Sequence, residues 1–178
     1  MRIHTLGHST RTLPELFGLL RVHGIERLVD VRRYPFSRRH PHFAGEALAV
    51  SLRAEGVDYR HEPDLGGRRA PRRDSPHTAW RDAGFRGYAD HMDTPAFSAA
   101  LERLMALAGE VPTAILCAEA LPWRCHRQLI ADALVARGVE VDHVLGPGPA
   151  EPHALNPDAR VLANGQLVYA GPPTLFTP

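Results

Sequence analysis

The sequence predicts an α/β fold: a single compact domain over residues 1–178, with a mostly parallel, open sheet flanked by helices and a C-terminal hairpin. Three observations predict this fold. Short apolar segments typical of buried strands alternate with amphipathic segments of helical period. Glycines end several of these segments, as expected where a helix returns to a sheet. Near the C-terminus an Asn-Gly pair lies between two apolar runs, which is typical of a hairpin.

The first helix has the clearest start signal. Residues 3–6 predict an apolar strand, after which Thr12, Pro14 and Glu15 supply the cap, the early proline and the capping-box acid of a helix. Gly24 is its natural end. The remaining expected elements are strands at 25–31, 57–60, 113–117 and 139–144, helices at 44–55, 95–108 and 125–137, and a hairpin across 160–168.

Two segments do not fit the alternation. Residues 61–84 are rich in Gly, Pro and Arg and are too long for a simple connection, so we expect a functional or disordered loop there. Residues 147–157 form a proline-rich surface segment. The N-terminus lacks the apolar segment of a secretory signal, and no apolar run reaches the ~18 residues of a membrane span. With two cysteines, we expect a cytoplasmic protein without a membrane partner or a disulfide framework.

Arginine carries all of the basic side-chain charge. Lysine and arginine together number 21, and all of them are arginine, which excludes lysine Schiff bases and P-loop lysines. The net charge of +1 and the pI of about 8.0 exclude a chain that is basic as a whole. The arginines nevertheless cluster at residues 32–39 and 68–73. Because guanidinium groups bind phosphate and carboxylate, these clusters indicate either an anion site or a solvated, arginine-rich surface.

Reactive side chains follow the predicted strands. The carboxyl ends of parallel strands share one edge of a sheet, where ligands bind in the crevice. The side chains expected at this edge are His8 and Ser9 after the first strand, Asp30 and Arg32 after the second, Arg68 beyond the third, and Cys117, Glu119, Cys125, His126 and Arg127 at the end of the fourth and beyond it. The convergence of thiol, imidazole, acid and guanidinium predicts a functional site.

Cys117 ends the clearest buried strand of the sequence. It is either a buried apolar thiol or a nucleophile activated by a nearby base, cation or helix start. His126 and Arg127 can supply these groups, and Glu119 can face the same crevice as an acid or base. Each has a plainer alternative: a solvated loop acid for Glu119 and a half-buried core histidine for His126.

Two sets of site residues are predicted. The catalytic set is Cys117, Glu119, His126 and His8; the substrate-binding set is Ser9, Asp30, Arg32, Arg68 and Arg127. For Asp30, an ion pair with Arg32 that fixes the loop is the alternative. We assign no metal and no other cofactor. A zinc site at Cys117, Cys125 and His126 is kept as an alternative below thiol chemistry, because seven residues between the cysteines is not a familiar zinc spacing.

Several motifs together resemble one protein family. They are Thr5-Leu6-Gly7-His8-Ser9, Asp30-Val31-Arg32, Leu65-Gly66-Gly67-Arg68, the run from Phe85 to Met92, and Leu116-Cys117-Ala118-Glu119 with Cys125-His126-Arg127. In this order they are similar to the domain-of-unknown-function family number 488. The resemblance runs over about residues 3–145, leaves 146–178 as an extension, and implies a compact α/β unit without assigning an activity.

Two further classes of function remain beside zinc. The first is an enzyme that acts on an anionic, phosphate-bearing substrate such as a nucleotide or nucleic acid, with Cys117 as nucleophile and Arg32 and Arg127 as anion clamp. The second is a module that binds nucleic acid or a nucleotide without chemistry, through arginines and the aromatic residues Tyr34, Phe36, Trp80 and Phe85. Neither composition nor motif indicates an oligomeric state.

Overall fold

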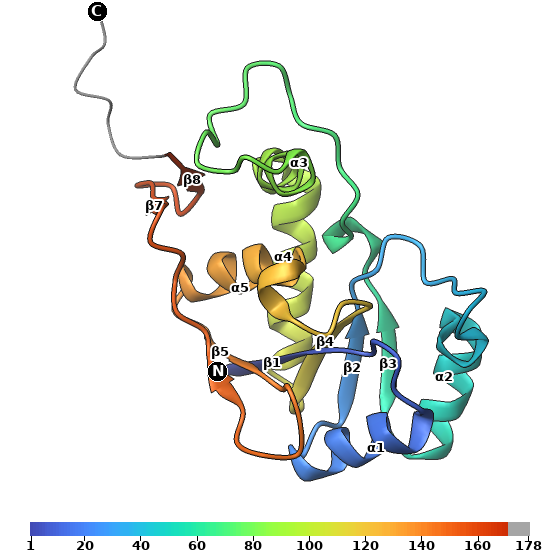
Figure 1. Ribbon diagram of the computed structural model, residues 1–178. Coiled ribbons are helices and arrows are strands. Elements are labelled where there is room, and N and C mark those ends of the chain that lie inside the picture. The colour runs from blue at the N-terminus through green and yellow to red at the C-terminus, as the bar shows by residue number, and fades with distance from the viewer. Residues whose placement is uncertain (171–178) are drawn as a thin grey trace, which may run out of the picture.

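The computed structural model describes residues 1–170 and confirms the α/β fold with a mostly parallel sheet (Figure 1). Its strands are β1 (Arg2–Gly7), β2 (Arg27–Asp30), β3 (Asp58–His61), β4 (Thr113–Cys117), β5 (Glu140–His143) and β6 (Glu151–Pro152). They lie in the order β3-β2-β4-β1-β5-β6, and β6 pairs antiparallel to β5. β1 and β4 are therefore adjacent at the centre, in a register that places Gly7 opposite Cys117.

Helices cover both faces of this sheet (Figure 1). α1 (Leu13–Val22) and α2 (Gly45–Ala54) pack on one face, and α3 (Ala83–Met92), α4 (Pro95–Ala108) and α5 (Arg127–Val135) pack on the other. Because side chains alternate along a strand, Leu116 of β4 joins the core beneath α1 and α2, whereas Ile115 and Cys117 join the core beneath α3 to α5. Cys117 thus points toward the α5 side.

The helix starts follow the expected capping chemistry. The Thr12 side chain accepts from the Glu15 amide and the Glu15 carboxylate accepts from the Thr12 amide, which completes the capping box. The Thr94 side chain caps α4 by accepting from the Phe97 amide, ahead of Pro95. Gly24 follows α1 with a φ of 62°, in the left-handed region that glycine tolerates.

The segment 61–84 contains regular secondary structure only near its two ends, and the helix that begins at its C-terminal end was not among the expected elements. A 3-10 turn covers Pro63–Leu65, and α3 begins after Asp82, whose side chain accepts from the Phe85 amide. Two glycines lower the helix propensity of α3. Gly87 is nevertheless needed, since a Cβ there would lie 2.3 Å from the Arg69 carbonyl oxygen.

A buried polar network holds the C-terminal segment onto the core. The predicted hairpin is present as β7 (Ala159–Val161) and β8 (Leu167–Tyr169). The Asp132 carboxylate on α5 accepts from His153 Nε2 at 2.9 Å, from the Asn156 amide and from the Tyr169 hydroxyl. The last eight residues of the expected extension, 171–178, lie outside the described residues. No helix among residues 1–170 has the length and apolar character needed to cross a membrane.

Candidate active site

A cleft of about 520 Å³ opens at the carboxyl edge of the central strands. It is lined by the ends of β1 and β4, the loop after β2, the loop after β3, and the start of α3 and of the segment before α5. The lining side chains that were predicted as site residues are His8, Arg32, Arg68, Cys117, Glu119 and His126, together with Cys125. Residues far apart in the sequence are therefore brought together at one edge.

Gly7 makes this convergence possible. The loop after β4 crosses over β1 so closely that a Cβ on Gly7 would lie 1.7 Å from the Glu119 carbonyl oxygen. The His8 amide donates to the Cys117 carbonyl at 2.9 Å, and the Ser9 amide donates to the Ala118 carbonyl at 2.8 Å. The strand ends are thus joined beyond the sheet, which fixes Cys117 beside His8.

Two thiols and an imidazole form the centre of the site. His126 Nδ1 lies 3.9 Å from the Cys117 Sγ and 3.8 Å from the Cys125 Sγ. Cys117 is 7% exposed and Cys125 is 3% exposed, and neither forms a disulfide. The three side chains come from the end of β4, the end of a 3-10 turn at Pro122–Arg124, and the N-cap of α5.

The pKa values of the two thiols depend on one another. The pKa of Cys117 is raised well above its ordinary value, because the thiol hydrogen bonds to Cys125 and because burial disfavours the thiolate. The pKa of Cys125 is lowered well below its ordinary value by the hydrogen bond from Cys117, by His126 and by the charge of Arg127. The two thiols therefore titrate as one coupled pair rather than as two independent groups.

His126 is held in one orientation by its other nitrogen. Its Nε2 lies 3.1 Å from the Val31 carbonyl oxygen, and a carbonyl only accepts, so Nε2 carries a proton. Nδ1 is consequently the nitrogen that faces the sulphurs. Gly67 packs against the ring so closely that a Cβ there would lie 2.8 Å from Nδ1. The Tyr88 ring also packs against that of His126, with 4.9 Å between ring centroids.

Arg32 is presented to the cleft by a buried ion pair. Its Nε donates to the Asp30 carboxylate at 2.8 Å and its Nη2 donates to the same group. Tyr59 donates its hydroxyl to Asp30 at 2.8 Å. Asp30 is fully buried and does not line the cleft, so the structure gives it the loop-fixing position that was its alternative. The pair holds the Arg32 guanidinium in the wall of the cleft that Cys117 and Cys125 also line.

His8 belongs to the same network. Its Nδ1 lies 3.0 Å from the Ser9 carbonyl, so Nδ1 donates, and Nε2 accepts from Arg32 Nη1 at 3.2 Å. Burial, followed by the charge of Arg32, lowers the pKa of His8 to about 4. The ring is thus neutral near pH 7 and both nitrogens are engaged, which places His8 as a support for Arg32. Ser9 is outside the cleft wall, with a φ of 49°.

Arg127 lies beneath the site instead of in its wall. The side chain is fully buried, and its Nη2 donates to the Glu119 carbonyl at 2.6 Å and to the Ala120 carbonyl at 3.2 Å. Its Nε and Nη1 have no hydrogen-bond partner within the described chain. Arg127 therefore fixes the loop that carries Glu119, a position different from the anion clamp expected for it.

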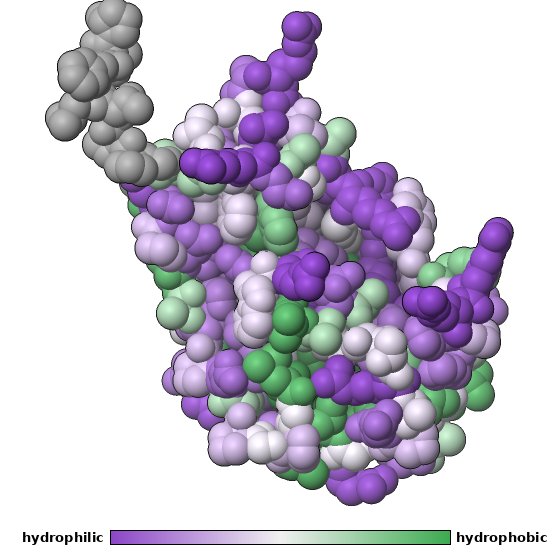
Figure 2. Space-filling model, in the orientation of Figure 1, coloured by the Kyte–Doolittle hydropathy of each residue, from purple (hydrophilic) through white to green (hydrophobic). Residues whose placement is uncertain are grey.

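The mouth of the cleft is rich in cations and aromatic rings. Arg33, Arg68 and Arg124 join Arg32 in the lining, against the carboxylates of Asp82 and Glu119. The most hydrophilic side chains of the face in Figure 2 project over the two loops that border this region, between β2 and α2 and between β3 and α3. Tyr34 is 60% exposed and Phe36 is 71% exposed. This arrangement suits an anion that carries a planar group.

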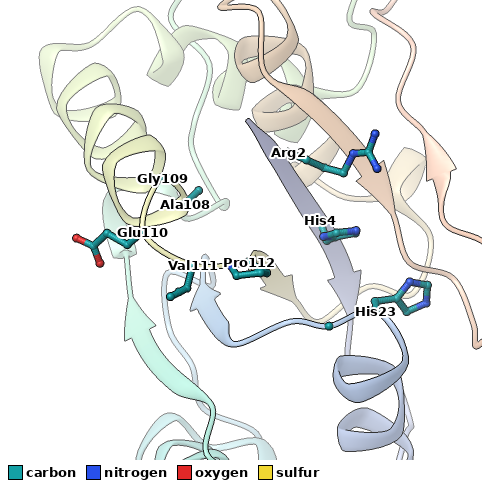
Figure 3. A pocket seen from close by; sticks show the side chains of 9 residues that line it. Arg2, His4, His23, Ala108, Gly109, Glu110, Val111 and Pro112 are labelled. Atoms are coloured by element: carbon teal, nitrogen blue, oxygen red, sulfur yellow. The ribbon is translucent and has the colours of Figure 1, made fainter.

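A second hollow, of about 460 Å³, lies at the opposite edge of the sheet (Figure 3). Arg2 and His4 of β1 line it with His23, and Glu110 points away from His4. Its charged groups are already engaged, because Arg2 pairs with Glu140 and Asp142, and Glu110 pairs with Arg27. It lacks the thiols and the arginine cluster, so the cleft beside Cys117 is the better candidate.

Some participants were not predicted from the sequence. Tyr59 and Tyr88 support the site from the β3 and α3 sides, and Gly67 makes room for His126. A glycine pair before Arg68 was the available signal for the last of these. Trp80, predicted as a binding aromatic, instead packs against Phe85 and Tyr169 and is not part of the cleft lining.

One comparison with known proteins bears on this site. The sequence model of the domain of unknown function DUF488 matches residues 12–134, more than half of the chain. The chain belongs to the DUF488 family. Comparisons with curated proteins and with solved structures found no match.

The DUF488 match covers most of the candidate site. Arg32, Arg68, Cys117, Glu119, Cys125 and His126 lie within the matched residues. His8 and Ser9 precede them, and the matched segment is shorter at both ends than the resemblance over 3–145. The family description names no activity, so the chemistry has to be argued from the residues themselves.

Proposed function

We propose that this DUF488 protein is a cytoplasmic enzyme that acts on an anionic, phosphate-bearing substrate, a nucleotide or nucleic acid, with Cys117 as its nucleophile. The observation that carries the proposal is the placement of the Cys117 thiol and the Arg32 guanidinium in the wall of one cleft. A guanidinium fixed by a buried carboxylate loses little entropy when it binds a phosphate. Two free thiols fit a reducing compartment.

The Cys117 thiol and His126 support the chemistry. His126 Nδ1 lies 3.9 Å from the Cys117 Sγ, and its Nε2 is engaged with the Val31 carbonyl, so Nδ1 is placed to take the thiol proton as Cys117 attacks. The Cys117 sulphur then forms a bond to the electrophilic centre, and the leaving group departs with the bonding pair and takes that proton. Water releases the covalent product, with Glu119 at the cleft wall as base. The cleft arginines balance the charge of the phosphate.

Binding without chemistry is the second candidate, and the exposed rings favour it. Tyr34 and Phe36 lie in the cleft lining beside Arg33 and Arg68, as in surfaces that stack bases and contact phosphates. Trp123, 55% exposed, lies next to Arg124 of the lining. This candidate predicts the same salt-dependent affinity as the enzyme but no turnover.

The test combines binding with turnover. Affinities for inorganic pyrophosphate and for a short single-stranded oligonucleotide are measured at two salt concentrations, with Arg32→Ala against the surface control Arg53→Ala. A set of phosphorylated substrates is screened for turnover with wild type and Cys117→Ser. Tighter binding at low salt, lost in Arg32→Ala, and turnover lost in Cys117→Ser are expected. Binding without turnover would favour the second candidate, and no binding at low salt would contradict both.

A further inference from the structure

The cluster of Cys117, Cys125 and His126 has the geometry of three metal ligands. Their ligand atoms, two Sγ and one Nδ1, all lie within 4.8 Å of one another. Tetrahedral zinc, with Zn–S of about 2.3 Å and Zn–N of about 2.0 Å, places sulphur and nitrogen ligands about 3.5 Å apart. The sulphur–nitrogen distances of 3.8 and 3.9 Å therefore need a shift of only a few tenths of an ångström.

The fold brings the two cysteines close together although seven residues separate them in the sequence. Between them the chain leaves β4, makes the 3-10 turn Pro122–Arg124 and returns to the sheet edge, where Cys125 points at Cys117. The Cys125 amide donates to the Pro122 carbonyl at 3.0 Å, which fixes the return. The two cysteines, eight positions apart in the sequence, are thus neighbours in space.

The donors also match the metal chemically. Two thiolates and an imidazole are the ligand set of a Cys₂His zinc centre. His126 Nδ1 is free to bind because Nε2 is engaged with the Val31 carbonyl, the support that metal-bound histidines usually have. The fully buried Arg127 lies close enough for its charge to stabilise both thiolates, and two of its donor groups have no partner in residues 1–170.

A second cluster of possible metal ligands differs, because an arginine side chain already neutralises its carboxylates. His77, Asp90 and Asp93 are as closely grouped, but Arg72 pairs with both carboxylates, at 3.3 and 2.8 Å. His77 Nδ1 accepts from the Tyr169 amide. There the guanidinium already supplies the positive charge, whereas within residues 1–170 neither sulphur has a hydrogen bond from an arginine side chain and each lies beside His126 Nδ1.

We propose that Cys117, Cys125 and His126 bind one Zn²⁺ ion, and that this ion switches off the thiol chemistry of the cleft. The inference rests on the proposed function for the role of Cys117, and it assigns a regulator to that site. All three ligand residues line the cleft, so the fourth coordination position faces the arginines and takes water or an oxygen of the anion. With the metal bound, neither sulphur is free to attack.

Zinc binding is tested on the reduced, chelator-treated full chain. Zn²⁺ alone is titrated against a chromogenic chelator, and Co²⁺ serves as a spectroscopic probe in the wild type. One Zn²⁺ per chain is expected, with a thiolate-to-cobalt absorption band. Cys125→Ser and His126→Gln should each weaken Zn²⁺ by at least about 100-fold, since losing even an outer-shell partner costs 10–100-fold. His23→Gln, at the opposite edge, should leave the affinity unchanged.

The outcomes separate this inference from the proposed function. Zn²⁺ should block labelling of Cys117 by a thiol reagent, and a chelator should restore it. A folded wild type that takes up no Zn²⁺, shows no cobalt–thiolate band, or binds equally in all variants overturns the metal site while leaving thiol chemistry intact. Full turnover in Cys117→Ser, together with stoichiometric zinc in the wild type that is weakened in Cys125→Ser and His126→Gln, would instead overturn the nucleophile and keep the metal site.

Discussion

The guanidinium of Arg127 donates to the main-chain oxygen of Glu119 across 2.6 Å, from a side chain that is fully buried. Burying a charged side chain costs free energy unless the charge is hydrogen-bonded or paired with a group of opposite charge. Here it holds the loop that closes over Gly7 and adds positive potential beneath the two thiols. Arg127 therefore connects the stability of the fold to the acidity of the site.

Arg127→Ala should destabilise the protein strongly. The change removes two hydrogen bonds from a charged donor and leaves a cavity, at a cost of about 3–5 kcal/mol in the free energy of unfolding. Urea unfolding followed by circular dichroism measures it. The exposed Arg53→Ala is the control and should change the stability by no more than about 0.5 kcal/mol. A midpoint equal to that of the wild type would contradict the structural role.

Asp30→Asn should weaken anion binding although Asp30 does not touch the ligand. The amide cannot hold both Arg32 nitrogens, so the guanidinium loses its fixed orientation and the buried pair is broken, at about 3–5 kcal/mol of stability. Tyr59→Phe removes a single hydrogen bond to the same carboxylate and should cost only about 1 kcal/mol. Pyrophosphate affinity is measured for both. If Asp30→Asn binds pyrophosphate as tightly as the wild type does, Arg32 needs no buried partner to bind the anion.

Stability should fall as the pH is lowered from about 6.5 to 4. Burial, His153 and Arg127 lower the pKa of His143 to about 4, from an ordinary value of 6.5. The unfolded chain then takes up a proton before the folded one, so His143 contributes fully above pH 6.5 and loses roughly 2–3 kcal/mol through this window. His8 titrates in the same direction.

The pH dependence is measured by urea unfolding at pH 7 and pH 5. His143→Gln should flatten it by about half, because His8 still contributes. If the free energy of unfolding changes between pH 7 and pH 5 by as much in this variant as in the wild type, the imidazole of His143 is not buried as described.

Two glycines should respond to alanine in opposite ways. Gly7→Ala places a Cβ 1.7 Å from the Glu119 oxygen and must displace the loop that carries Cys117, at a cost of about 2 kcal/mol or more. Gly18→Ala, in α1, meets nothing within 4 Å and should stabilise the helix by about 0.5–1 kcal/mol. The melting temperatures of the two variants, compared with that of the wild type, test this prediction. A Gly7→Ala variant with wild-type stability and thiol reactivity would contradict the close approach of the loop after β4 to Gly7.

Much of the fold was predictable because its signals are local. The capping box at Thr12, the proline after Thr94 and the apolar run 113–117 each specify an element by short-range chemistry. α3 was not predictable in this way, since Gly87 serves a contact with a loop almost twenty residues earlier. A residue chosen for a tertiary contact weakens the local pattern.

The sequence predicted which residues gather at the site better than it predicted the role of each residue. The rule for parallel sheets placed Cys117, Arg32 and His126 at one edge. It gave no means to tell that Asp30 and Arg127 are buried supports, because burial of a charged side chain depends on what the rest of the chain packs over it. The Arg127 donors that have no partner within residues 1–170, and the approach of His126 to both thiols, are likewise visible only in three dimensions.

The most direct test of the central claim is the labelling rate of Cys117 by a small thiol reagent, measured in Cys125→Ser so that one thiol remains, with and without inorganic pyrophosphate. The account predicts labelling in the native state that pyrophosphate slows, and no such protection when Arg32→Ala is added. A thiol that reacts only after unfolding, or one that pyrophosphate leaves untouched, would contradict a reactive cysteine in an anion-binding cleft.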